Sequence, residues 1–218
     1  MLEHANANPD RNLWSLVSCI AIAKGSLPET VYFGGPLPTA SMDDLDAAWV
    51  LKGLGADKPF GEQEEKLSLF GQFVGDWVGE ATFIKEDGSE VPGGGKGEVH
   101  FRWILEGRAV QDVWMSEDPD SKAMVPGGTT LRFYDPEKGV WQSTWISPKQ
   151  NTSLTFTGRE VDGEIVLEAV NKRGRLEHWI FYDIKKGASF KWRGEGSSDG
   201  GRTWKPYVRY SFKRSKLV

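Results

Sequence analysis

The sequence contains a single cysteine, Cys19, among its 218 residues. One thiol can form no intrachain disulfide, and it cannot build a site with several thiolate ligands. Histidines are nearly as scarce, because His4, His100 and His178 are the only three and are widely scattered. Their positions match none of the spacings of a metal-binding motif. We therefore expect neither disulfide bonds nor a metal centre.

Long hydrophobic runs are missing as well. The only sizeable one extends from Leu13 to Ala23, well short of the roughly 20 apolar residues that span a bilayer. Leu16-Val17-Ser18-Cys19 resembles a lipoprotein cleavage box, but the apolar run continues past Cys19, whereas that of a signal peptide precedes the cleavage point. We expect a cytoplasmic protein with no membrane partner.

A basic surplus is also absent, since 27 Lys and Arg face 31 Asp and Glu for a net charge of −4. Nucleic-acid binders usually carry such a surplus on one face, so no nucleic-acid partner is expected. No nucleophile elbow, phosphate loop or dinucleotide fingerprint occurs either. Gly93-Gly94-Gly95 lacks the Lys-Ser/Thr pair of a phosphate loop and is interpreted as a flexible hairpin loop.

Tryptophan, in contrast, is abundant, with ten copies. Aromatic side chains bury a large apolar area with few rotatable bonds, so they suit both a packed core and the wall of an apolar pocket.

Residues 1–60 differ in texture from the remainder and are predicted to form an N-terminal extension. Leu13–Lys24 is compatible with a short helix or a strand. A helix is predicted over about 41–52, where Ser41 precedes two acidic residues. A second helix is predicted over about 62–73, with Leu67, Phe70 and Phe73 on its apolar face, and we expect it to close one end of the domain that follows.

From residue 61 to residue 218 the periodicity indicates a β-domain. Strands are predicted near 77–85, 97–105, 109–115, 129–135, 139–146, 153–158, 163–171, 176–184, 188–195 and 203–214. Turn signals such as Asp87-Gly88 and Asp162-Gly163 separate them, which is typical of an antiparallel meander. Closure removes the open edges of so long a meander. The fold class is therefore all-β, an up-and-down barrel of about ten strands, with 92–95 and 116–128 as its longer loops.

Alternation assigns an inward face to most strands. The expected inward residues are Trp77, Gly79, Ala81, Phe83, Val99, Phe101, Trp103, Leu105, Leu131, Phe133, Trp141, Trp145, Leu154, Phe156, Phe190 and Trp192. The 176–184 strand is apolar on both faces, so its orientation stays open. We expect its outer face to be covered by the N-terminal helices or by a second subunit, which makes a homodimer one of the expectations.

Three segments together resemble a bacterial family of lipocalin-like (calycin) barrels of unknown function: Leu69–Glu80 with its Gly75-Asp76-Trp77, Trp103–Arg108, and Ser197–Trp204. The resemblance covers about 62–214. It implies that Trp77 closes the base of the barrel and that a late basic residue, Arg209 or Arg214, stacks over it.

A distant resemblance to nitrobindin raises the question of haem. Nitrobindins carry a haem-binding histidine in the last strand region, and Tyr207, in Lys205–Arg209, stands at the matching position. Tyrosine is the less common haem ligand. We therefore expect no haem and no other cofactor.

Two residues are candidates for chemistry inside the barrel. Asp112 lies between Val110 and Trp114, and an inward carboxylate there would need a partner such as Arg132 or a raised pKa. The equal alternative is that Asp112 and Trp114 both point outward. His178 would point inward if Leu176, Ile180 and Tyr182 do, and the alternative to a functional role is a core histidine with one satisfied hydrogen bond.

The first functional hypothesis is binding of a small, largely apolar or aromatic molecule in the barrel. The expected lining is Phe83, Phe101, Trp103, Trp114, Phe133, Trp141, Ser143, Trp145 and Tyr207. The alternative is an enzyme of the cyclase or isomerase type that uses Asp112 or His178 as acid or base. A third alternative is a structural, dimerising module whose tryptophans are mostly core.

Overall fold

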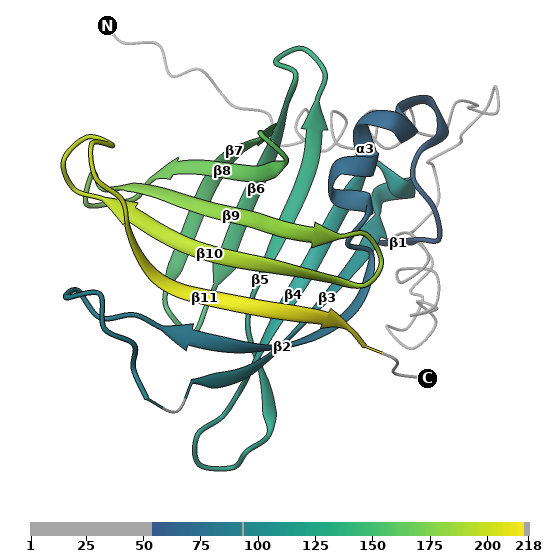
Figure 1. The fold of residues 1–218 in the computed structure, drawn as a ribbon. Coiled ribbons are helices and arrows are strands. Elements are labelled where there is room, and N and C mark those ends of the chain that lie inside the picture. The colour runs from purple at the N-terminus through teal and green to yellow at the C-terminus, as the bar shows by residue number, and fades with distance from the viewer. Residues whose placement is uncertain (1–53, 93, 216–218) are drawn as a thin grey trace, which may run out of the picture. The chain divides into compact units, whose positions relative to one another are not determined.

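Ten consecutive strands alternate in direction along the chain, each joined to the next by a hairpin connection, with a longer loop between β2 and β3 (Figure 1). They are β2 (Gly75–Phe83), β3 (Gly95–Ile104), β4 (Ala109–Glu117), β5 (Met124–Asp135), β6 (Val140–Ser147), β7 (Thr152–Val161), β8 (Glu164–Val170), β9 (Leu176–Lys185), β10 (Ser189–Ser197) and β11 (Lys205–Arg214). Each strand pairs with its sequence neighbours, and β11 pairs with β2 to close the ring. This arrangement confirms the prediction of a ten-stranded antiparallel barrel.

This computed structural model describes residues 54–92 and 94–215. Leu13–Lys24 and the helix predicted over about 41–52 lie outside those ranges. A two-residue strand, β1 (Gly55–Ala56), precedes the barrel and pairs with the end of β3. No helix in the described ranges is long and apolar enough to cross a membrane.

One predicted loop is mostly strand. The 116–128 segment was expected to be a long loop because of its proline and glycines, yet β4 runs to Glu117 and β5 begins at Met124. A register shift after Trp114 accommodates Pro126 opposite Met115. Bulges are places where a strand tolerates proline, which explains why the composition was misleading.

The short helix before β2 fills one end of the barrel. A 3₁₀ turn, η1 (Gly61–Gln63), leads into α3 (Glu64–Gly71), as predicted for this segment. Leu67, Phe70 and Phe73 are fully buried. The ring of Phe70 lies 4.8 Å from that of Trp141, and the ring of Phe73 lies 4.9 Å from that of Phe190. Aromatic pairs at these distances make this end a packed floor.

Trp77 belongs to the same floor. Its indole Nε1 donates a hydrogen bond of 2.6 Å to the carbonyl of Phe73, and the Arg214 guanidinium lies 4.9 Å from its ring centroid. Arg214 is paired with Trp77 across β11 and β2, whereas Arg209 is paired with Thr82 and is exposed. Of the two arginines expected to stack on Trp77, it is therefore Arg214 that does so.

Gly75 makes that stacking possible. Its φ of +133° is unfavourable for residues with a side chain. A Cβ at this position would lie 2.0 Å from a nitrogen of the Arg214 guanidinium. The glycine of the Gly-x-Trp segment thus leaves room for the arginine that covers the tryptophan.

The orientation of two strands differs from expectation or was left open. On β5, Leu131 and Phe133 face outward, and Phe133 is 46% exposed. Thr130 and Arg132 occupy the inward positions and are buried. The alternation pattern predicted the wrong inward face for this strand, because its polar residues face inward. There Arg132 and the backbone N–H of Thr130 contact Asp112. On β9, the inward residues are Glu177, Trp179 and Phe181.

Candidate ligand-binding site

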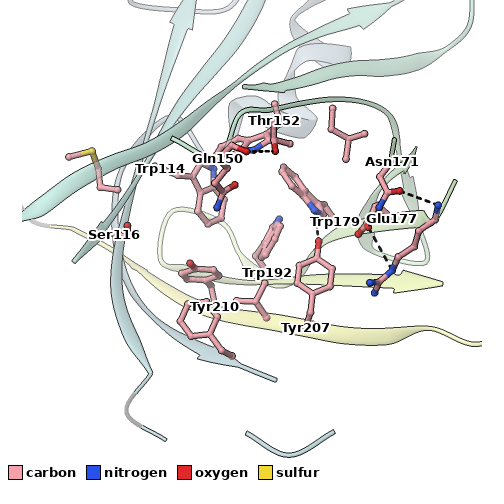
Figure 2. Close-up of a pocket in the computed structure, with 17 residues that line it drawn as sticks. Trp114, Ser116, Gln150, Thr152, Asn171, Glu177, Trp179, Trp192, Tyr207 and Tyr210 are labelled. Carbon is pink, nitrogen blue, oxygen red and sulfur yellow. Dashed lines mark hydrogen bonds and ion pairs between the residues drawn. The ribbon is translucent and has the colours of Figure 1, made fainter. Parts of the chain in front are cut away.

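A cavity of about 600 Å³ opens at the end of the barrel opposite α3 (Figure 2). Phe83 at the end of β2, Ser116 near the end of β4 and Tyr207 at the start of β11 all line it. Alternating strands bring these ends together at one rim. The full lining is Phe83, Trp114, Met115, Ser116, Gly127, Trp145, Gln150, Thr152, Leu154, Asn171, Arg175, Glu177, Trp179, Trp192, Tyr207, Val208 and Tyr210.

Four tryptophans form a continuous aromatic wall of this cavity. Ring centroids are separated by 5.3 Å between Trp114 and Trp192, 5.4 Å between Trp192 and Trp179, and 5.5 Å between Trp179 and Trp145. Tyr210 packs against Trp114 at 5.4 Å. Neighbouring tryptophan rings pack against one another with their planes at 59–75°, so the wall is a preformed apolar surface, suited to an apolar or aromatic ligand.

Strand β10 creates the space in front of this wall by tapering along its inward face. Phe190 packs in the floor and Trp192 lies in the wall above it, whereas Gly194 and Gly196 follow at the rim. A Cβ on Gly194 would lie 2.6 Å from the ring of Tyr207, and one on Gly196 would lie 2.1 Å from the Arg175 guanidinium. The two glycines thus allow Tyr207 and Arg175 to lie flat against β10.

A polar cluster stands at one side of the rim, centred on Glu177, which is only 8% exposed. Its carboxylate accepts a hydrogen bond of 2.8 Å from Asn171 Nδ2 and forms an ion pair of 3.8 Å with Arg175 Nε. The Tyr207 hydroxyl lies close enough to this carboxylate to feel its charge, and it accepts a 2.9 Å hydrogen bond from Trp179 Nε1. Figure 2 shows Asn171 and Glu177 at one side of the rim and, beside them, the hydrogen bond between Tyr207 and Trp179 of the aromatic wall.

The Tyr207 hydroxyl stays protonated in this setting. Burial raises the pKa of Tyr207 well above its usual range, and the negative charge of Glu177 adds to the rise. Burial also raises the pKa of Tyr210. Both phenols are therefore neutral hydrogen-bonding groups at neutral pH.

The nine residues predicted to line a cavity separate into three groups. Phe83, Trp114, Trp145 and Tyr207 line the observed one. Phe101, Trp103, Trp141 and Ser143 face inward but are buried deeper and are not among its lining residues. Phe133 faces outward because of the orientation of β5.

Asp112 points inward and pairs with Arg132, one of the partners expected for it. The two side chains are fully buried, and Arg132 Nη1 contacts Asp112 Oδ2. The other carboxylate oxygen accepts a 2.9 Å hydrogen bond from the backbone N–H of Thr130. The Arg132 guanidinium also lies 5.0 Å from the centroid of Phe70, on the floor. Asp112 is therefore part of the packed interior and does not line the cavity.

His178 lies on the outside of the barrel, because its neighbours Glu177 and Trp179 face inward. Its ring stacks on Trp204 with centroids 3.5 Å apart and planes at 11°. Its two nitrogens lie 3.4 Å from carboxylate oxygens of Glu168 and Glu195. The structure thus separates His178 from Asp112, and neither meets the cavity.

Several lining residues were not predicted as site residues: Trp179, Trp192, Tyr210, Asn171, Arg175 and Glu177. The alternation of apolar and polar residues did predict that Trp192 faces inward, although it was not named as a site residue. Trp179 lies on the strand whose orientation was open. Arg175 and Asn171 lie in the turn between β8 and β9, and no local pattern reveals that side chains of this turn line the cavity. No group of three or more potential metal ligands occurs in the ranges that the structure describes.

Asp199-Gly200-Gly201, in the hairpin beside the rim, has a structural role. The Asp199 carboxylate accepts hydrogen bonds from Ser197 Oγ at 2.7 Å and from Thr203 Oγ1 at 2.6 Å. It also accepts one from the backbone N–H of Arg202 at 3.0 Å. These bonds hold the pKa of Asp199 well below its usual range. The carboxylate fixes the β10–β11 hairpin and is not available to a ligand.

No protein-family model and no curated protein matches the chain. Among solved structures, the chain is similar to the S-type phycobiliprotein lyase CPES from Guillardia theta, with a TM-score of 0.48 and 11% identity over 69% of this chain and 93% of that one. It is also similar to Rv2717c from M. tuberculosis, with a TM-score of 0.45 and 9% identity over 69% of this chain and 97% of that one. Similarity at this level carries no information about a ligand.

Proposed function

We propose that this protein binds a small, largely apolar or aromatic molecule in the cavity at the open end of its barrel. One observation carries the proposal: a space of about 600 Å³ is walled by four tryptophans while the opposite end is packed by α3. Ligand sites are typically concave, mostly apolar and of this size, with a few polar groups that orient the ligand. The Glu177 cluster supplies such groups.

Binding is favoured over catalysis by the position of the two residues proposed as acid or base. Asp112 is buried against Arg132, and His178 lies outside against Trp204. A general acid or base must come within hydrogen-bond reach of the reacting atom, and neither residue lines the cavity. The purely structural alternative requires a filled barrel, so the open cavity favours ligand binding over it as well.

Haem is not part of the proposal, because Tyr207 is poorly suited to hold it. A tyrosine binds ferric iron as phenolate, whereas burial and Glu177 raise the pKa of this hydroxyl. The hydroxyl also accepts a hydrogen bond from Trp179. Cytoplasmic location and a homodimer stay predictions.

Native mass spectrometry of the freshly purified protein tests the proposal. We expect a co-purifying small molecule, or failing that, saturable one-to-one binding of added N-phenyl-1-naphthylamine, a neutral aromatic probe. Trp179→Leu should weaken binding by roughly two- to tenfold, since an aromatic wall residue contributes about 0.5–1.5 kcal/mol beyond its area. Trp204→Leu makes the same change on the outer surface and should leave binding intact.

Two results would contradict the proposal. One is a protein that carries no ligand and does not bind the probe. The other is equal loss of binding in Trp179→Leu and Trp204→Leu, because it would place the probe outside the cavity or trace its loss to general destabilisation.

A further inference from the structure

The rim of the cavity holds an arginine, Arg175, whose outer donors have no acceptor among the residues that the structure describes. The only hydrogen-bonding or ionic contact of Arg175 side-chain nitrogens in the described part of the chain is the 3.8 Å ion pair from Nε to Glu177. That distance is too long for a hydrogen bond, and Nε is buried without a hydrogen-bond partner. A guanidinium has five N–H donors in a planar fork that suits a carboxylate or a similar anion.

The guanidinium is also held in place before any ligand arrives. It lies flat over the backbone of Gly196, where a Cβ would come within 2.3 Å of Cζ, and 5.9 Å from the centroid of Tyr207. Its side chain is 37% exposed, so the donors can be reached from solvent. A rigid, accessible donor set loses little conformational entropy when it binds an anion.

Glu177 does not cancel the attraction of this site for an anion. Its carboxylate already accepts a hydrogen bond from Asn171 and forms the ion pair with Arg175. A smaller cleft adjoins the rim, and Arg175 and Tyr207 line both spaces. That cleft adds Lys85 and Lys205 against Glu86 and Asp199, and the Asp199 carboxylate is already engaged within its own turn.

We infer that the ligand carries one anionic group, a carboxylate or a chemically similar oxyanion, which is bound by Arg175 at the rim while its apolar body lies against the tryptophan wall. The inference rests on the proposed function and specifies its ligand class. An acidic aromatic or polyene compound fits this description, and a neutral hydrocarbon or a cation does not.

A matched pair of fluorescent probes tests the inference. N-phenyl-1-naphthylamine and 8-anilinonaphthalene-1-sulfonate share one aromatic scaffold and differ by a sulfonate. We expect the wild-type chain to bind the anionic probe more tightly, and higher salt to weaken that preference. Arg175→Gln should reduce affinity for the anionic probe by about tenfold or more while changing that for the neutral probe less than about twofold.

Two variants separate the local contact from general charge. Arg173→Gln removes the same charge from an exposed position in the same turn and should leave both affinities unchanged. Glu177→Gln removes the nearby negative charge and should maintain or increase affinity for the anionic probe. Thermal unfolding of each variant shows whether it is folded during the titration.

The outcomes distinguish this inference from the proposed function. If neither probe binds the wild-type chain, the proposed function fails and the inference fails with it. If the neutral probe binds but the sulfonate gives no advantage, or if Arg175→Gln weakens both probes equally, only the inference is overturned.

Discussion

The most heavily buried charges of the barrel are those of Asp112 and Arg132. A buried ion pair adds little net stability compared with apolar residues of similar volume, but removing one partner leaves the other charge uncompensated. The pair lies between the floor formed by α3 and the tryptophan wall. Thr130 Oγ1, Ser143 Oγ and Arg132 Nε nearby have no hydrogen-bond partner among the described residues.

Asp112→Asn should therefore destabilise the protein by about 3 kcal/mol or more, because it leaves the Arg132 charge buried and unpaired. Chemical denaturation at pH 7 measures this difference. The double variant D112L/R132M removes both charges and should be clearly more stable than Asp112→Asn. A loss below about 1 kcal/mol in Asp112→Asn would mean that the two groups do not form a buried pair.

Because of Tyr207, the free energy of unfolding should decrease at alkaline pH. Its pKa is raised above the ordinary value of 10.0, so the folded chain keeps a proton that the unfolded chain loses. The contribution is fully present below pH 10 and decreases as the pH rises above it, at up to about 1.4 kcal/mol per pH unit.

Denaturation experiments between pH 8 and pH 11 should therefore show stability falling less steeply in Tyr207→Phe than in the wild-type chain. Tyr210→Phe should show a similar effect, because burial raises the pKa of that hydroxyl too. The same slope in wild type and both variants would show that these phenols are not shielded from solvent.

At the scale of elements, α3 and β10 determine where the barrel is filled and where it is open. Helix α3 inserts Leu67 and Phe70 at one end, and β10 changes from aromatic residues to glycines toward the other. The helix was predictable because its apolar positions have helical spacing. The taper of β10 was not, because a glycine in a sequence does not reveal which side chain crosses over it.

Gly194→Ala tests whether the change from aromatic residues to glycine along β10 keeps the cavity open. A Cβ there would lie 2.6 Å from the Tyr207 ring, so the ring must move and its hydrogen bond to Trp179 should break. We expect a stability cost of about 1–3 kcal/mol from overpacking and a loss of at least about tenfold in affinity for N-phenyl-1-naphthylamine. Gly61→Ala, where nothing lies within 4 Å of the added Cβ, is the control. Unchanged binding in Gly194→Ala would show that Tyr207 does not shape the cavity.

The strands themselves were largely predictable, because hairpin turns and two-residue alternation are local signals. The prediction of side-chain orientation was wrong where the interior is polar. Arg132 is of a residue type usually found on the surface, so Leu131 and Phe133 were predicted to face inward in its place. The orientation of β9 stayed undecided, because the adjacent residues Trp179 and Ile180 are both apolar. In such strands only the pairing with neighbouring strands decides which face is buried.

For the molecule as a whole, the sequence predicted the closed barrel but placed the cavity too deep. Of its expected wall, Phe101 and Trp141 belong to the packed interior, while Trp114 and Trp145 line the open end. The depth of a cavity depends on how many side chains fill the floor, and that requires the three-dimensional position of α3. We therefore predict that a ligand enters only the rim half of the barrel.

The indole N–H signals of the ten tryptophans offer the most direct test of that claim. In ¹H–¹⁵N NMR spectra recorded during titration with N-phenyl-1-naphthylamine, we expect large shifts for Trp114, Trp145, Trp179 and Trp192. The signals of Trp77 and Trp141 on the floor should stay nearly unchanged. Shifts confined to Trp204 on the outer surface, larger shifts on the floor than at the rim, or no saturable shifts at all would contradict the account.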